Sequence, residues 1–331
     1  MLESVKDKFL NNSNTSEIVK TYSLNLLFKS KDEEVDHKSN DDNYYHLIIE
    51  LSTLAIEKYL SGISMDELVH AGECLLSGNQ RFWKMINTGE LQDLKSLELE
   101  LRLLYKKNYN KNLPDRIITL IKMFSADEKL SYLKGQLCSA NIPNFKVAPF
   151  ELNSRHAFDS IVKEYFVDLK KEAELLVNDQ VKAIPYKMYG PNWSRLPIYR
   201  NGKFEDKYEP SMPNTFAFVK KCEELGRLIS FDLLLMEPGK KLFHHSDGFA
   251  FFDNWQLGLI IPNDCGLNVM GEKIMHEEGK SFLFNDSFNH YAWNGSEERR
   301  VIATAWVVHR EWSEDEVHAL KFLAKTMKWG S

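Results

Sequence analysis

Two histidines and an aspartate in the C-terminal half of the chain have the side-chain types of a metal site. His245 and Asp247 are separated by one residue, and His290 follows an apolar segment at 281–284. Residues i and i+2 of a strand face the same side, so His245 and Asp247 could point at one metal ion, with His290 reaching it from a neighbouring strand. Two imidazoles and a carboxylate on one face are typical of non-haem Fe(II) oxygenases, which keep coordination positions open for co-substrate and oxygen. Zn(II) could also occupy this set.

A basic residue at a short distance strengthens this interpretation. Arg300 comes ten positions after His290, at the start of an apolar segment. Its guanidinium could hold the far carboxylate of a dicarboxylic acid through a bidentate pair. The alternative is a surface ion pair between Arg300 and Glu297 or Glu298, and the neighbouring Arg299 is the residue expected to face solvent.

Other residues near these motifs have simpler interpretations. His244 is expected beside the metal site or at the surface rather than as a ligand. Two further histidines of this region, His276 and His309, are expected to be structural, and Trp293 and Trp306 are expected to be core aromatics.

The segments that must position these side chains are short and strand-like. They are rich in Val, Ile, Leu and Phe and are separated by Gly, Pro, Asn and Asp, which favour turns. Many short strands between turns predict a sandwich or a barrel. The predicted strands are 231–236, 256–261, 267–270, 281–284 and 301–308, with a helix whose face includes Phe158, Ile161, Tyr165 and Leu169 before them and a periodic segment at 314–328 after them.

The N-terminal half has a helical pattern instead. Leu91, Leu94, Leu101 and Leu104 form one apolar stripe, and a second helix is predicted from Pro114 onward, with Ile117, Ile118 and Ile121 on one face. We therefore predict an α+β protein of two parts. Residues 1–142 would be a helical domain for substrate or partner recognition, and residues 143–331 a β domain that holds the site.

Composition excludes several classes of protein. The 331 residues are 43% hydrophobic and 27% charged, which is ordinary for a globular protein and excludes disorder. The net charge of −6 argues against a nucleic-acid binder. No apolar run approaches the roughly 18–20 residues of a membrane span, and the charged N-terminus and four distant cysteines do not indicate secretion. We expect a cytoplasmic protein that binds neither nucleic acid nor membrane.

Four stretches of the C-terminal half resemble one known family. They are MEPGKKLFHHSD (236–247), LGLIIP (257–262), EEGKSFLFNDSFNHYAWN (277–294) and RVIATAWVVHREW (300–312). Together they resemble the aspartyl/asparaginyl β-hydroxylases, a family of Fe(II)- and 2-oxoglutarate-dependent dioxygenases. The resemblance implies a double-stranded β-helix, the jelly-roll or cupin fold, for this half of the chain.

The resemblance also implies roles for individual residues. His245 and His290 match the metal-binding histidines of the family, and Arg300 matches its 2-oxoglutarate-binding arginine. Gln256 stands where the family often has a polar residue or histidine near the co-substrate. Asp247 completes a ligand triad in which the animal members have glycine. Two departures concern the co-substrate, because Leu234 and Asn254 replace polar or basic contacts of the animal enzymes.

The function implied by the resemblance is hydroxylation of an unactivated carbon in a free amino acid or a peptidyl residue. Fe(II), 2-oxoglutarate and O2 would be required, and succinate and CO2 released. The helical region could bind a leader peptide or carrier protein that presents the substrate. Two alternatives remain open: a metal-dependent cupin enzyme without redox chemistry, and a silent metal-binding sensor or interaction module, which the departures at Leu234 and Asn254 would favour.

Overall fold

The computed structural model describes residues 94–124, 145–150, 156–185, 193–242, 249–288 and 290–326. The chain divides into two compact units, residues 1–76 and 77–331, and all described residues lie in the second. No helix in the described ranges has the length and apolar composition needed to cross a bilayer.

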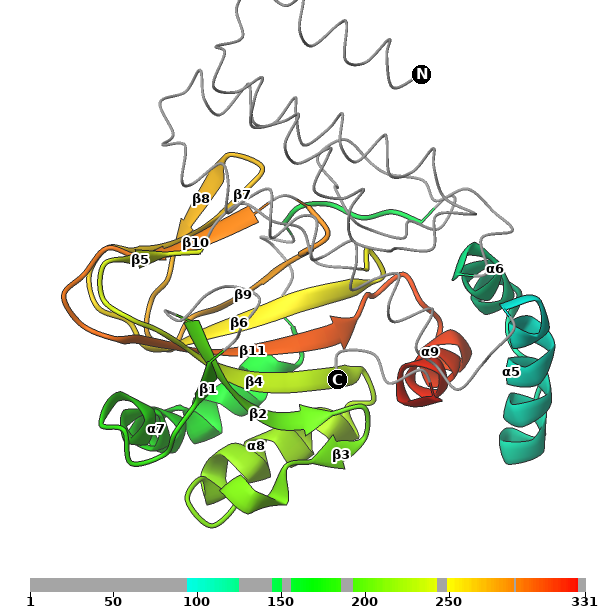
Figure 1. The fold of residues 1–331 in the computed structure, drawn as a ribbon, viewed down its shortest axis with the longest axis horizontal. Coiled ribbons are helices and arrows are strands. Elements are labelled where there is room, and N and C mark those ends of the chain that lie inside the picture. Colours follow the sequence, from blue (N-terminus) through cyan, green and yellow to red (C-terminus); the bar gives the residue numbers. More distant parts are fainter. Residues whose placement is uncertain are drawn as a thin grey trace, which may run out of the picture. The chain divides into compact units, whose positions relative to one another are not determined.

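Figure 1 shows how the helices and strands of the described residues are arranged. The helices are α5 (Leu94–Tyr109), α6 (Asp115–Phe124), α7 (Phe158–Val177), α8 (Pro213–Glu224) and α9 (Glu314–Thr326), with a 3-10 turn, η2 (Asp206–Tyr208). The strands are β1 (Ile184–Pro185), β2 (Trp193–Arg200), β3 (Lys203–Phe204), β4 (Leu228–Met236), β5 (Lys240–Lys241), β6 (Phe252–Ile260), β7 (Cys265–Val269), β8 (Glu272–Met275), β9 (Ser281–Phe284), β10 (His290–Asn294) and β11 (Arg300–Val308).

The strands form two antiparallel sheets. The larger sheet has the order β1-β2-β4-β11-β6-β9, with β3 paired to β2, and the smaller sheet has the order β5-β10-β7-β8. From β4 onward the chain passes back and forth between the sheets, so that β4, β6, β9 and β11 lie in one and β5, β7, β8 and β10 in the other. This is the strand exchange of a jelly roll, and it confirms the double-stranded β-helix expected for the C-terminal half.

The two faces of the larger sheet have different compositions. Leu233 on β4, Leu257 on β6 and Ala303 on β11 are buried in one apolar cluster with α7 and α8, which lie against this face of the sheet (Figure 1). Side chains alternate along a strand, so Gln256 and Thr304 face the other way, into the space between the two sheets. We call this space the barrel interior.

A buried carboxylate joins the two helices that cover the outer face. Glu172 of α7 is 6% exposed and accepts hydrogen bonds from the first turn of α8. Its donors are the main-chain N–H groups of Asn214 and Thr215, both at 2.8 Å, the Asn214 side-chain amide at 2.9 Å and the Thr215 hydroxyl at 2.6 Å. Met212, at the N-cap of α8, provides no side-chain cap, so Glu172 satisfies the orphan N–H groups from outside the helix.

Helices α5 and α6 pack on α9. Ile117, Leu120 and Ile121 of α6 share a buried cluster with Leu320 and Leu323 of α9. At the edge of this contact Arg116 donates to both carboxylate oxygens of Glu316, at 2.8 and 2.7 Å. The predicted domain boundary between residues 142 and 143 lies outside the described residues, so the division into two domains stays a prediction.

The five predicted strands are all found in the structure, which also has elements that were not predicted. The segment 281–284 is confirmed as β9, and the other predicted strands correspond to longer or shifted strands. The predicted stripe at Leu101 and Leu104 is wrong for Leu104, which is 40% exposed, because the buried face of α5 continues from Leu101 to Tyr105. Helix α8 and strands β1, β2, β3, β5, β8 and β10 were not predicted.

Candidate functional site

The structure describes only part of the predicted metal site. His245 and Asp247 lie in 243–248, outside the described residues, while His290, Arg300 and Gln256 are described. Among the described residues there is no group of three His, Cys, Asp or Glu side chains that could hold a metal ion, and only one of the three predicted ligands is among them. The ligand set therefore stays a prediction.

His290 has one of its ring nitrogens held by the main chain. It begins β10, is buried, and packs its ring edge-on against Phe284 at 5.2 Å between ring centroids. Its Nδ1 lies 2.8 Å from the main-chain oxygen of Phe288. A carbonyl oxygen can only accept, so Nδ1 carries the proton and Nε2 carries the lone pair. Metal-binding histidines are commonly held in this way, and His290 fits the predicted role.

Arg300 is a buried cation with an incomplete set of partners. It is fully buried at the start of β11, and its Nη1 donates to the main-chain oxygen of Trp293 at 3.2 Å. Its Nε and Nη2 have no hydrogen-bond partner among the described residues. The Trp193 ring lies 5.5 Å from the guanidinium carbon. Burial lowers the Arg300 pKa to about 10, so the side chain is still charged at neutral pH.

The arrangement around Arg300 does not support the surface ion pair considered for this residue. Its guanidinium forms no ion pair with Glu297 or Glu298 in the described part of the chain. Arg299 is the one that pairs at the surface, with Glu237 at 3.0 Å and Asp179 at 2.9 Å. A buried cation without a counter-ion is costly, and two unused donors on a planar fork match a carboxylate. Arg300 therefore fits an anionic ligand.

Asn294 fixes the turn that leads into β11, although the sequence patterns did not single it out. The side chain is fully buried, and its amide donates to the main-chain oxygens of Met236 and Glu237 at 3.2 Å and of Glu298 at 2.8 Å. These bonds connect the end of β4 to the β10–β11 turn. Asn294 therefore helps to set where Arg300 enters the sheet. The asparagine before Gly295 is a turn signal that could have indicated this role.

Gln256 lies in the barrel interior, as a co-substrate residue would, and contacts a histidine predicted to be structural. Its Oε1 is 2.9 Å from Nε2 of His276, and both side chains are buried. The two departures from the family pattern, Leu234 and Asn254, lie on β4 and β6 of the larger sheet. Asn254 bonds to Asp286 at 3.1 Å and to the Thr304 hydroxyl at 2.7 Å, whereas Leu234 is half-buried against an apolar cluster.

The two tryptophans predicted to be core residues are only half-buried, and both donate hydrogen bonds. Trp306 Nε1 donates to Asp286 at 2.8 Å, and Trp293 Nε1 donates to Asp264 at 3.0 Å. Their indoles therefore carry polar contacts that an apolar core position would not need. His309 is buried, with Nε2 at 3.9 Å from Asp253, in keeping with a structural histidine.

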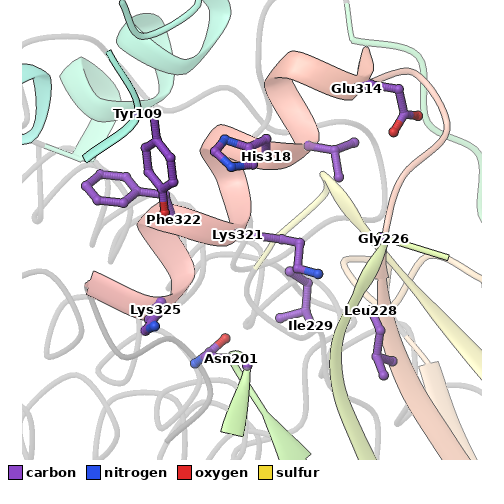
Figure 2. A pocket seen from close by; sticks show the side chains of 12 residues that line it. Tyr109, Asn201, Gly226, Leu228, Ile229, Glu314, His318, Lys321, Phe322 and Lys325 are labelled. Carbon is purple, nitrogen blue, oxygen red and sulfur yellow. The ribbon is translucent and has the colours of Figure 1, made fainter. Parts of the chain in front are cut away.

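A separate hollow of about 390 Å³ lies away from Arg300. Figure 2 shows the side chains that line it, among them Tyr109, His318, Lys321 and Phe322. It borders Leu228 and Ile229 at the beginning of β4, whereas Arg300 pairs with Met236 at the other end of that strand. Lys321 is already paired with Glu223 at 3.2 Å. None of the predicted site residues lines this hollow.

Comparison with known proteins gives one family for the part of the chain that holds the predicted site. The family model described as aspartyl/asparaginyl beta-hydroxylase matches residues 157–310. The mouse aspartyl/asparaginyl beta-hydroxylase is 25% identical over 209 residues, which cover 58% of this chain and 28% of that protein. The ornithine lipid ester-linked acyl 2-hydroxylase of Rhizobium tropici is 32% identical over 140 residues, covering 41% of this chain and 46% of that protein.

These matches span less than half the length of each of the two relatives. Among solved structures, a Pseudomonas putida prolyl-4-hydroxylase is similar, with 18% identity and a TM-score of 0.30, over 46% of this chain and 99% of that one. The matched residues 157–310 contain all the residues predicted for the site, including the two outside the described ranges.

Proposed function

We propose, from the match of residues 157–310 to the aspartyl/asparaginyl β-hydroxylase family model, that the protein is an Fe(II)- and 2-oxoglutarate-dependent dioxygenase. It would hydroxylate an unactivated carbon of a free amino acid or a peptidyl residue. The fold, the family match and the hydroxylase names of the relatives support this reaction class.

The observation that carries the proposal is the buried guanidinium of Arg300. A side chain with two unused donors in a dry interior would bind the far carboxylate of 2-oxoglutarate strongly, because charge-assisted pairs gain strength where water is excluded. The Trp193 ring and the Trp293 carbonyl hold the guanidinium in place. The carboxylate would therefore meet donors that are already oriented.

The predicted ligands of the metal are His245, Asp247 and His290. Of these, the orientation of His290 supports the proposal, because its Nδ1–H is held by Phe288. Iron together with 2-oxoglutarate and O2 supplies the oxidation of a C–H bond and releases succinate and CO2. The protein binds the co-substrate, orients it through Arg300 and excludes water. Phe284, Leu267 and Ala292, packed in one buried cluster beside His290, provide the apolar surroundings.

The substrate class has two candidates. An amino acid or peptidyl residue is in keeping with the family name. A fatty acyl group of a lipid is the second candidate, favoured by the Rhizobium acyl 2-hydroxylase, whose identity of 32% exceeds that of the mouse protein. Incubating the loaded enzyme with each class and searching by mass spectrometry for a gain of one oxygen atom would separate them.

We also propose that the N-terminal region predicted to be helical, residues 1–142, binds a leader peptide or carrier protein that presents the substrate. Its position ahead of the family match supports this role. Removing residues 1–93 should then weaken turnover of the true substrate while leaving 2-oxoglutarate binding intact. Unchanged kinetics after the removal would contradict the role.

The proposed function can be tested without the substrate. Fe(II) and 2-oxoglutarate added to the protein without oxygen should give the weak visible charge-transfer band of the chelated 2-oxo acid. The band should vanish in His245→Ala and weaken in Arg300→Ala. If metal binds but no band forms, the dioxygenase proposal is wrong. A cupin enzyme without redox chemistry or a metal-binding sensor would then be the better description.

A further inference from the structure

His276 is a buried histidine that the proposed function leaves without a role. It follows β8, packs against Phe282 at 5.3 Å between ring centroids, and is 6% exposed. Its main-chain N–H donates to the oxygen of Cys265 at 2.9 Å, and its Nε2 faces Oε1 of Gln256 at 2.9 Å. The ring is therefore held at its backbone and at one nitrogen.

The other ring nitrogen, Nδ1, is buried and has no hydrogen-bond partner among the described residues. Burial, and then the nearby charge of Arg300, lowers the pKa of His276 well below its ordinary value, so the ring is neutral. A neutral ring has one N–H and one lone pair, and a buried atom of either kind without a partner reduces stability.

Arg300 also has buried nitrogen atoms without hydrogen-bond partners in the described part of the chain, and it lies near His276. Its Nε and Nη2 are buried without partners in the described ranges. The Trp293 oxygen that accepts from Arg300 is on β10, opposite Gly266 of β7. The neighbouring Cys265 carbonyl accepts from the His276 main-chain N–H. The Arg300 charge also contributes to the lowered pKa of His276. The unsatisfied nitrogen atoms are Nδ1 of His276, after β8, and Nε and Nη2 of Arg300, at the start of β11. Both residues therefore lie beside the start of β7. A single anion could satisfy them all.

We propose that His276 is a second co-substrate-binding residue, whose Nδ1–H donates to the same carboxylate of the dicarboxylic acid that Arg300 binds. The inference rests on the proposed function and adds a residue to its site. Arg300 would supply two N–H donors and His276 a third, within the four lone pairs of a carboxylate.

Gln256 would set the tautomer of His276. With its oxygen toward Nε2, as in the structure, the histidine proton is on Nε2. Rotation of the amide by half a turn places its NH2 group against Nε2, which then accepts, and the proton moves to Nδ1. The ring is neutral in both states, so no proton is gained or lost. An anion beside Nδ1 would favour the second state.

The experiment uses the full-length protein loaded with Zn(II), which neither reacts with oxygen nor broadens magnetic resonance signals. Titration calorimetry measures the dissociation constants of 2-oxoglutarate and of 2-oxopentanoate, which has the same 2-oxo acid end but lacks the far carboxylate. His276→Asn keeps an amide near the position of Nδ1, and His276→Gln keeps one near Nε2. His309→Gln, at another buried histidine, is the matched control, and the melting temperature of each variant shows that it folds.

We expect His276→Gln to weaken 2-oxoglutarate binding about 10- to 100-fold, the effect of one charge-assisted hydrogen bond, and to leave 2-oxopentanoate binding nearly unchanged. His276→Asn should keep most of the wild-type affinity for 2-oxoglutarate, and His309→Gln should change neither dissociation constant. In the wild-type protein with 15N-labelled histidine, 2-oxoglutarate should shift one histidine from the Nε2–H to the Nδ1–H form.

Two other outcomes have distinct meanings. Equal weakening of both acids in His276→Gln, or no weakening together with no tautomer shift in the wild type, would show that His276 only supports the fold. Failure of the wild-type protein to bind either acid with Zn(II) bound would overturn the proposed function, and this inference with it.

Discussion

On β6, Trp255, Leu257 and Leu259 face helices α7 and α8, whereas Asn254 and Gln256 face the barrel interior. Successive side chains of this strand therefore alternate between an apolar side and a polar side. The outer side is closed by helices and its residues are packed on one another. The inner side carries amides, a histidine and an arginine with hydrogen-bonding capacity still unused.

The buried charges make the difference clear. Glu172, between the two covering helices, accepts four hydrogen bonds and has no evident task beyond joining them. Arg300, in the interior, has one main-chain acceptor for its guanidinium. A buried charge with a complete set of partners stabilises the fold, whereas an incomplete set in a native protein needs a functional explanation. Substitutions at these two residues, and at two further charged residues, test this contrast.

The largest effect is expected from Arg300→Met. Removing one member of a buried charge pair costs about 2–5 kcal/mol, so the affinity for 2-oxoglutarate should fall about 100-fold or more. The melting temperature should stay the same or rise, because the ligand-free protein loses an unpaired buried charge. Titration calorimetry and thermal unfolding of the same samples measure both. If Arg300→Met is less stable than the wild type but binds 2-oxoglutarate normally, Arg300 supports the fold and does not bind the acid.

Glu172→Ala should show the opposite pattern. It leaves several buried donors of α8 without an acceptor, and we expect the free energy of unfolding to fall by about 3 kcal/mol. Glu172→Gln, which keeps one acceptor oxygen, should cost about half as much. Urea unfolding measures both losses, and the dissociation constant of 2-oxoglutarate should be unchanged. If Glu172→Ala loses affinity for 2-oxoglutarate but no stability, the outer face of the larger sheet is not purely structural, contrary to the comparison of the two faces.

Glu316 extends the comparison to a saturated carboxylate outside the sheet. The hydrogen bond from Arg116, with further bonds from Ser313, lowers the Glu316 pKa to about 2. The stabilisation is therefore fully present above about pH 4.5 and is lost as the pH falls toward 2. Because Arg116 is partly exposed, we expect Glu316→Gln to cost about 1–2 kcal/mol at pH 7. Urea unfolding from pH 7 to pH 3 should show this difference shrinking, and a constant difference would exclude the ion pair as its cause.

The smallest effect is expected from Arg299→Met, the neighbour of Arg300. Its ion pairs with Glu237 and Asp179 are partly exposed, and such pairs contribute about 0–1 kcal/mol. Stability should change by less than about 1 kcal/mol and the affinity for 2-oxoglutarate by less than about threefold. If Arg299→Met weakens 2-oxoglutarate binding as much as Arg300→Met does, the acid is attracted by the positive charge near both arginines and not by the buried guanidinium of Arg300.

The sequence predicted the parts of the molecule that have a local signal. Short segments rich in apolar residues between turn residues indicated β4, β6 and β11, and the types and spacing of His245, Asp247, His290 and Arg300 indicated a site. His290 and Arg300 are buried, with the His290 Nδ1 against a carbonyl oxygen and two Arg300 nitrogens unused in the described ranges, and their roles stay predictions. Strand β8 was not predicted because its four residues are largely exposed and include two charged ones, so it does not form an apolar segment.

What could not be predicted depends on contacts between distant residues. Glu172 and Thr215 are 43 positions apart, and no local pattern shows that the carboxylate of one helix caps the next. His276 was interpreted as structural because nothing in the sequence places it beside Gln256 or Arg300. Gln256 on β6 contacts His276 in the connection after β8. The pairing of β10 with β7 places the carbonyl that binds Arg300 beside the one that binds the His276 backbone.

The packing of α6 on α9 has a practical consequence for anyone dissecting the molecule. Cutting the chain at residue 143 would remove Ile117, Leu120 and Ile121 and uncover the apolar side of α9. Freshly exposed patches of this kind promote aggregation. A shortened version for crystallisation should therefore start ahead of Leu94, so that the last helix of the fold keeps its cover.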